Sequence, residues 1–267
     1  MNDPLAALPY YGGASATSRS GIARWAAQIL PQTDTYCEPF AGMLGVLLQR
    51  PPAQTEIAND LNGDITNWWT IVRDRPDELT AKLRLTPTSH HEFYTAKHAD
   101  WSKLDELERA RATTILLACG YGNFARRSYA QYKGKYSPFV GQGLTQITDR
   151  IHRLADRLRN VTLLAQNAPT LLRQLNSRPT AVVYCDPPYQ TDDRHLHHSD
   201  HHLDVNDFTE AAQQSKCHVI IQGRPGEWEH LNWPSYTLPP THQARKQANP
   251  DILWANRPLQ TGDLFND

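Results

Sequence analysis

A carboxylate, two prolines and an aromatic ring follow one another at Asp186-Pro187-Pro188-Tyr189. The apolar residues 181–185 are typical of a buried parallel strand, which ends here because proline donates no ladder hydrogen bond. Asp186 and the Pro187 carbonyl offer fixed acceptors, and Tyr189 offers a flat face for stacking. This set suits an aromatic amine, because both amino hydrogens can be bound while the nitrogen lone pair is directed towards an electrophile. A proline-stiffened turn is the alternative interpretation.

Two upstream strands end in residues that suit a nucleoside-like cofactor. The strand at 35–38 leads into a small-residue loop, 39–45, and a helix at 46–48, an arrangement that cradles such cofactors. The loop lacks G-x-G-x-x-G spacing and no lysine follows it, which disfavours dinucleotides and triphosphates. The strand at 55–60 ends in Asp60, at the offset where an acid commonly receives ribose hydroxyls. A cap for the following helix is the alternative role.

Apolar periodicity places further elements around these strands. Asn167 follows the third strand and could bind an adenine edge or cap the next helix, so both roles stay open. The paired glycines at 12–13 allow a sharp turn or a close approach of the backbone to a ligand. Further strands are expected at 161–164, 217–222, 236–238 and 252–255, and amphipathic helices at 21–30, 61–73 and 144–158.

The middle of the chain changes character twice. Residues 76–118 are polar, helix-rich and charged, which indicates an inserted helical subdomain with solvated faces. Residues 120–143 then carry four basic side chains, six aromatic rings and no acid. Basic groups interleaved with rings suit phosphates and base edges together, so we expect this segment to contact DNA or RNA rather than form a plain surface loop.

Composition narrows the class of protein. The chain has 267 residues, which is enough for one large α/β domain with an insertion. Its net charge of −1 neither indicates nor excludes a nucleic-acid partner. The four cysteines lack C-x-x-C spacing and are expected to be reduced core residues of a cytosolic protein. We expect neither a membrane-spanning segment nor a signal peptide.

Histidines gather in one loop, residues 195–202, after the Asp-Pro-Pro-Tyr motif. No cysteine or ordered ligand spacing accompanies them, so we favour a mobile polar lid over a zinc site and assign no metal. The histidines are His195, His197, His198, His201 and His202.

Taken together, these motifs resemble the DNA adenine methylase family, the N6-adenine methyltransferases whose catalytic motif is Asp-Pro-Pro-Tyr. The resemblance runs along nearly the whole chain in the order of the family. Two positions depart from its pattern: Ala14 stands where a lysine is usual, so that Arg19 could substitute, and Asn167 stands where aspartate is frequent. The matching stretches are Tyr11-Gly12-Gly13, Glu38-Pro39-Phe40-Ala41-Gly42, Asn59-Asp60, residues 120–139, residues 186–189 and Leu253-Trp254-Ala255-Asn256.

The resemblance implies an α/β, Rossmann-like sheet with the last strand antiparallel, S-adenosylmethionine as cofactor and double-stranded DNA as partner. Residues 1–75 and 144–267 would form the catalytic domain, and residues 76–143 an inserted, mainly helical target-recognition subdomain. Asp186 and Pro187 would hold the amino group of a flipped adenine, with Pro188 completing the motif and Tyr189 stacking on the base. The implied cofactor contacts are Tyr11, Gly12, Glu38, Pro39, Phe40, Gly42, Asp60, Asn167 and Asp186, and the implied DNA contacts are Asn123, Arg126, Arg127, Lys133 and Lys135.

The expected product is N6-methyladenine in DNA, made without a metal or a covalent enzyme intermediate, because the amino nitrogen is itself the nucleophile. The alternatives are methylation of cytosine N4, of RNA or of a protein amide, and a catalytically silent DNA-binding module. The intact motif argues against the silent module, and the basic aromatic segment argues against a protein substrate. We also expect a monomer or weak dimer in the cytoplasm of a bacterial or phage-infected host cell.

Replacing Arg126 and Arg127 with alanine should lower DNA affinity and flatten its salt dependence. Each lost phosphate contact reduces the slope of log affinity against log salt by about one. If one arginine reads a base edge, its loss should also relax sequence preference by roughly 1–3 kcal/mol. Binding titrations across a salt series measure both effects. Unchanged binding in the double variant would make residues 120–143 an ordinary surface loop.

Overall fold

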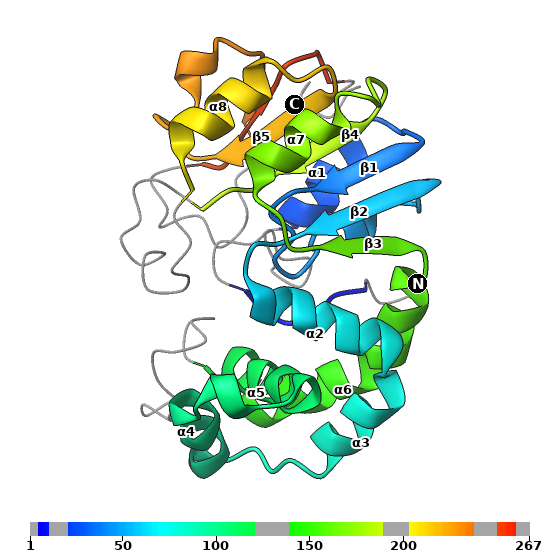
Figure 1. Ribbon diagram of the computed structural model, residues 1–267, viewed down its shortest axis with the longest axis vertical. Helices are drawn as coiled ribbons and strands as arrows, with labels where there is room; N and C mark the ends of the chain where they lie inside the picture. Colours follow the sequence, from blue (N-terminus) through cyan, green and yellow to red (C-terminus); the bar gives the residue numbers. More distant parts are fainter. Residues whose placement is uncertain (1–4, 11–20, 121–138, 189–202, 238–249, 260–267) are drawn as a thin grey trace.

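The computed structural model has a seven-stranded sheet at its centre, with strand order β3-β2-β1-β4-β5-β7-β6 (Figure 1). The structure describes residues 5–10, 21–120, 139–188, 203–237 and 250–259. Every strand expected from the sequence is present. The strands are β1 (Thr35–Glu38), β2 (Thr55–Asn59), β3 (Val161–Leu164), β4 (Val182–Cys185), β5 (His218–Gly223), β6 (Ser235–Thr237) and β7 (Ile252–Ala255).

The register of the sheet brings four strand ends to one edge. Strands β1 to β5 pair in parallel, with Cys37 opposite Ile57 on one side and Val183 on the other. Strand β7 runs antiparallel to both β5 and β6, as the resemblance implied. Because the carboxyl ends of parallel strands share an edge, the residues that follow β1, β2, β3 and β4 are neighbours.

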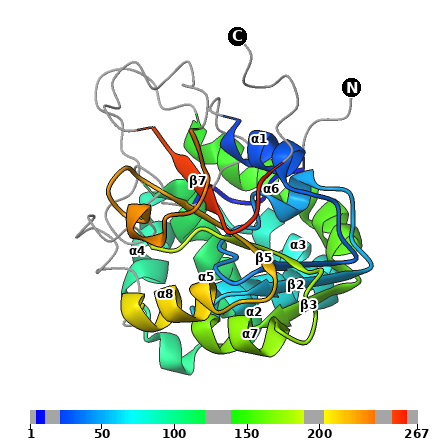
Figure 2. The ribbon, with the colours of Figure 1, turned by 90° about the horizontal axis from the view of Figure 1, so that it is seen from above.

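Helices cover both faces of the sheet, with α1 on one side and α7 and α8 on the other (Figure 2). The alternation of side chains along β4 explains this: Val182 and Tyr184 face the α1 side, whereas Val183 and Cys185 face α7 and α8. The helices are α1 (Ile22–Ile29), α2 (Gly63–Asp74), α3 (Pro76–Arg84), α4 (His90–His98), α5 (Glu106–Cys119), α6 (Phe139–Leu158), α7 (Ala168–Leu175) and α8 (Val205–Gln213), with short 3-10 turns η1 (Leu47–Gln49), η2 (Trp101–Lys103) and η5 (Glu229–Leu231).

Two helix predictions need correction. The helix expected at 46–48 is only the single 3-10 turn η1, because Pro51 and Pro52 follow directly and cannot continue a helix. Helix α6 begins at Phe139 rather than at 144. Gly143 lies inside it, and a Cβ there would lie 3.2 Å from the Ala118 carbonyl oxygen, so this glycine allows α6 to approach α5 closely. The expected domain boundary at 143/144 therefore falls within a helix.

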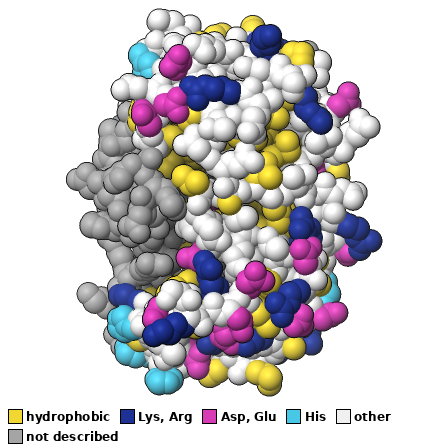
Figure 3. Space-filling view, in the orientation of Figure 1, with side chains coloured by type: hydrophobic (Ala, Val, Ile, Leu, Met, Phe, Trp, Pro, Cys, Tyr) yellow, Lys and Arg dark blue, Asp and Glu magenta, His cyan; other side chains and the backbone are white. Residues whose placement is uncertain are grey.

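Helices α2 to α6 form a helical layer below the sheet in Figure 1. The buried apolar residues of α2, α3 and α6 belong to the same apolar core as those of the α1 face, whereas α4 packs against α5 in a separate apolar cluster. On the face in view, acidic and basic side chains are interspersed over this layer (Figure 3). This distribution agrees with the expectation of solvated charged faces for residues 76–118.

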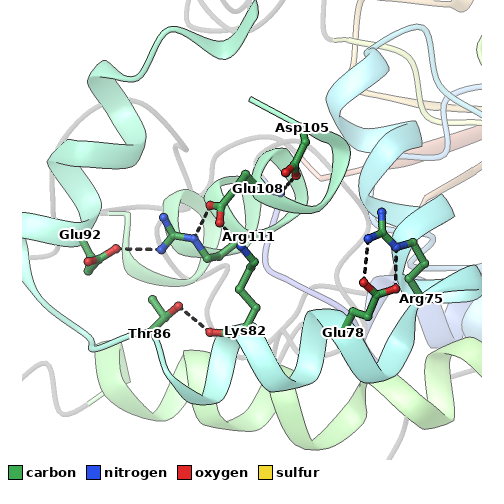
Figure 4. Close-up of polar contacts among 8 residues, drawn as sticks. All are labelled: Arg75, Glu78, Lys82, Thr86, Glu92, Asp105, Glu108 and Arg111. Carbon is green, nitrogen blue, oxygen red and sulfur yellow. Dashed lines mark hydrogen bonds and ion pairs between the residues drawn. The ribbon is translucent and has the colours of Figure 1, made fainter. Parts of the chain in front are cut away.

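An ion-pair network joins three helices of the layer (Figure 4). Arg111 of α5 donates to Glu92 of α4 and to Glu108 of its own helix, both at 2.8 Å. Lys82 of α3 pairs with the same Glu108. The Arg111 side chain is only 18% exposed, so solvent screens these contacts less than it screens the more exposed Arg75–Glu78 pair of the same layer.

All four cysteines are buried and free, as expected. Burial raises the pKa of Cys119 to about 11, which keeps this thiol protonated and unreactive at neutral pH. Within the part of the chain that is described, no helix combines the length and the apolar character needed to cross a membrane.

Replacing Arg111 with alanine should lower the free energy of unfolding by about 1–3 kcal/mol, because two partly buried carboxylates lose a shared partner. Arg75→Ala is the matched control, since it removes an arginine–glutamate pair at an exposed position of the layer, and it should leave stability nearly unchanged. Urea unfolding of the three proteins provides the comparison. Equal losses in the two variants would contradict the structural role of Arg111.

Candidate active site

The side chain of Asn59 holds three strand ends together. It is completely buried, and its Nδ2 donates to the carbonyl oxygens of Pro39 at 2.8 Å and Gln166 at 2.9 Å. Its Oδ1 accepts the Gln166 N–H at 2.8 Å. One amide thus fixes the loops that follow β1, β2 and β3 against one another. The sequence placed Asn59 in a motif but gave no reason to single it out as a site residue.

The loop after β1 is further held at Gly42. The Gly42 N–H donates to Asp60 Oδ2 at 2.8 Å, and its carbonyl accepts the indole N–H of Trp69 at 2.8 Å. Its φ of 45° lies in the left-handed region, and a Cβ there would lie 3.3 Å from the Tyr10 ring. The conformation favours glycine at this position, and a Cβ would also press against the Tyr10 ring.

Asp60 connects the first two loops. One carboxylate oxygen accepts the Gly42 N–H and the other accepts the Asn62 N–H at 2.9 Å. The alternative role of capping α2 belongs to Asn62, whose side chain accepts from Asp64. Each carboxylate oxygen has more than one lone-pair direction, so these bonds are compatible with additional donors from a ligand.

Tyr10 is a site residue that the sequence did not identify. Its ring covers Gly42, and burial raises the pKa of its hydroxyl far above the ordinary value, with the Asp60 charge adding to the effect and a hydrogen bond to Asn62 opposing it. Its position next to the Tyr11-Gly12-Gly13 stretch was the only signal in the sequence.

Glu38 stabilises the loop after β1 from inside the protein. Its buried Oε1 accepts the Leu47 N–H at 2.6 Å and the Tyr36 hydroxyl at 2.9 Å. Burial raises the pKa of Glu38 to about 7, and both hydrogen bonds oppose this rise. Across the loop, Arg157 of α6 donates to the Leu47 carbonyl at 2.9 Å and pairs with buried Glu56 of β2. Side chains therefore hold both the backbone N–H and the carbonyl of Leu47.

Asp186 leaves the sheet beside the end of β1, on the side away from β2. Strand β4 lies between β1 and β5, and Asp186 itself is partly buried. Pro187 after it is buried, whereas Pro188 is exposed. On the same edge, the Phe40 ring meets the Phe208 ring edge to face, with 5.4 Å between ring centroids. Asp186 and Pro187 after β4 therefore lie at the same edge of the sheet as the loops that follow β1 and β2.

The remaining predicted site residues either cap a helix or lie outside the described residues. Asn167 is exposed and caps α7, with its Oδ1 accepting the Thr170 N–H at 3.2 Å, so an adenine contact would come from its amide nitrogen. Among the described residues, no group of three or more histidine, cysteine, aspartate or glutamate side chains could hold a metal ion. The predictions that lie outside the described residues are Tyr11, Gly12, Asn123, Arg126, Arg127, Lys133, Lys135, Tyr189 and the histidines of residues 195–202.

Comparison with known families now decides the class of protein. Residues 18–237 match the model of the D12 class N6 adenine-specific DNA methyltransferases. The chain belongs to this family. The match confirms the family that the motifs predicted.

Individual relatives are distant in sequence but match more than half of this chain. A DNA adenine methylase of Serratia marcescens is 25% identical over 205 residues, which cover 72% of this chain and 71% of that protein. A DNA adenine methylase of Escherichia coli (strain K12) is 25% identical over 206 residues, with 73% and 69% covered. A DNA adenine methylase of Salmonella typhi is 24% identical over 172 residues, with 60% and 58% covered.

Glu38 should give this D12-class protein a pH-dependent stability. Because its pKa in the folded protein is about 7, against an ordinary value of 4.5, the folded state binds the proton more tightly than the unfolded chain does. The resulting stabilisation is complete below about pH 4.5 and is lost as the pH rises to about 7, on the order of 3 kcal/mol in total.

Glu38→Gln tests this, because the amide oxygen can still accept from Leu47 and Tyr36 but cannot ionise. Urea unfolding at pH 5, 6, 7 and 8 should show wild type losing stability relative to the variant as the pH rises. Parallel curves for the two proteins would contradict the assignment.

Proposed function

We propose that this chain transfers a methyl group from S-adenosylmethionine to N6 of a flipped adenine in double-stranded DNA. The observation that carries the proposal is the meeting of two features at one sheet edge, in a D12-class chain. One is the loop pair fixed by Gly42 and Asp60, and the other is the acceptor pair Asp186 and Pro187.

The ends of β1 and β2 have a donor and acceptor set that fits S-adenosylmethionine. Gly42 is buried beneath the Tyr10 ring and adds no side chain to the loop, and the Asp60 carboxylate, which is only partly buried, can accept ribose hydroxyls while it keeps the Gly42 N–H. When bound, S-adenosylmethionine supplies a methyl group that is already electrophilic. We assign Glu38 to holding the loop rather than to ligand contact, because the side chain is buried and its Oε1 accepts from Leu47 and Tyr36.

The end of β4 receives the base. The Asp186 carboxylate and the Pro187 carbonyl accept the two hydrogens of the adenine amino group, which draws its lone pair out of ring conjugation. After transfer, the nitrogen loses a proton, and the hydrogen-bonded Asp186 carboxylate is the group that takes it. Tyr189 stacks on the base, which must leave the duplex because a stacked amino group cannot reach a buried methyl donor.

The helical layer presents the basic aromatic segment to DNA. Helix α5 ends at Cys119 and α6 begins at Phe139, so the segment between them is anchored on two helices that pack together through Ala118 and Gly143. We therefore keep residues 76–143 as the target-recognition subdomain, although α6 continues from it into the catalytic domain. The four basic side chains of residues 120–143 give this subdomain its affinity for phosphates.

The reaction product tests the proposal. Duplex DNA incubated with enzyme and S-adenosylmethionine should contain N6-methyladenine by nucleoside mass spectrometry, with or without a chelator. Asp186→Ala should lower the rate at least about a hundredfold, because the amino group loses its acceptor, while calorimetric titration still shows cofactor binding. Asp156→Ala, which removes an exposed acid of α6, is the control and should be fully active.

Three outcomes would contradict this assignment. They are N4-methylcytosine as the main product, loss of activity on chelation, and an Asp186→Ala variant as active as the control.

A further inference from the structure

Two consecutive tryptophans of α2 match each other in burial and in the length of one hydrogen bond. Trp68 and Trp69 are both completely buried, and each indole N–H donates one hydrogen bond of 2.8 Å. Their rings meet edge to face, with 4.6 Å between centroids. They differ in the acceptor: Trp68 donates to Thr114 Oγ1 of α5, whereas Trp69 donates to the Gly42 carbonyl of the loop after β1.

The bond from Trp69 completes the restraint on the Gly42 peptide. Asp60 holds the N–H of this residue, Trp69 holds its carbonyl, and the Tyr10 ring covers its Cα. Glycine has the largest conformational freedom of any residue, so without these contacts the loop would sample many backbone conformations. A loop already fixed in its binding conformation loses less entropy when it takes a ligand.

We propose that Trp69 is a positioning residue for S-adenosylmethionine: its indole N–H orients the Gly42 peptide and so preforms the cofactor loop. The inference rests on the proposed function, because it takes that loop as the cofactor site. Trp69 reaches the ligand only through Gly42. Trp68 has no such role, because its indole N–H donates to Thr114 of α5 and not to the cofactor loop.

The pair provides its own matched control. Trp69→Phe and Trp68→Phe each keep a buried aromatic ring and delete one hydrogen bond of equal length. Both should therefore lower the midpoint of thermal unfolding of the free protein by similar amounts. A typical net hydrogen bond changes an equilibrium constant roughly twofold to tenfold. Trp69→Phe should weaken S-adenosylmethionine binding within that range in calorimetric titration, and Trp68→Phe should bind like wild type.

Steady-state kinetics supply a second readout. Trp69→Phe should raise KM for S-adenosylmethionine and leave kcat within about twofold, because a saturating cofactor restores the loop conformation that the hydrogen bond had preformed. Trp69→His keeps a ring N–H and should recover part of the affinity lost in Trp69→Phe, although a smaller ring packs less well. Trp68→His is the control for that substitution.

The outcomes separate this inference from the proposed function. Wild-type affinity in Trp69→Phe, or an equal loss of affinity in Trp68→Phe, would overturn the positioning role while the cofactor assignment stands. If Trp69→Phe is unfolded at the assay temperature, both phenylalanine variants are titrated at a lower temperature at which they are folded, and equal affinities there would overturn it as well. A wild-type protein that does not bind S-adenosylmethionine would refute the proposed function itself.

Discussion

The buried amide of Asn59 is the constraint on which the site depends. Loops at a sheet edge carry backbone N–H and C=O groups that need partners once water is excluded. Asn59 satisfies three such groups, from Pro39 and Gln166, and thereby sets the spacing of the loops after β1, β2 and β3. An apolar residue of the same size would leave these groups unpaired and the loops free to separate, so both the chain path at Gly42 and the position of Asp60 follow from this one side chain.

The helical layer does more than carry a recognition segment. Two of its helices reach the loop after β1: Trp69 of α2 holds Gly42, and Arg157 of α6 holds Leu47. Helix α6 begins at Phe139, inside the basic aromatic segment of residues 120–143. Helix α6 therefore connects the segment that would bind DNA with the loop that would bind the cofactor.

The sequence predicted the sheet well, because runs of β-branched and apolar residues such as 182–185 identify buried strands locally. It failed where tertiary contacts decide. The glycines of α6 interrupted its helical pattern, although Gly143 serves close packing on α5. Neither Tyr10 nor Trp69 could be found, since their roles come from contacts with Gly42 more than twenty-five residues away from each. The acceptors Asp186 and Pro187 could be predicted, because the role proposed for them depends only on residues that are adjacent in the sequence.

The two halves of the site obtain their rigidity in different ways. On the base side, the rings of Pro187 and Pro188 fix the backbone covalently, so the acceptor geometry needs little outside help. On the cofactor side, the glycine that allows close approach also removes stiffness, and tertiary hydrogen bonds from Asp60 and Trp69 must restore it. Substitutions far from the ligands should therefore act mainly on cofactor affinity and much less on the geometry of methyl transfer, because only the cofactor side depends on residues distributed through the fold.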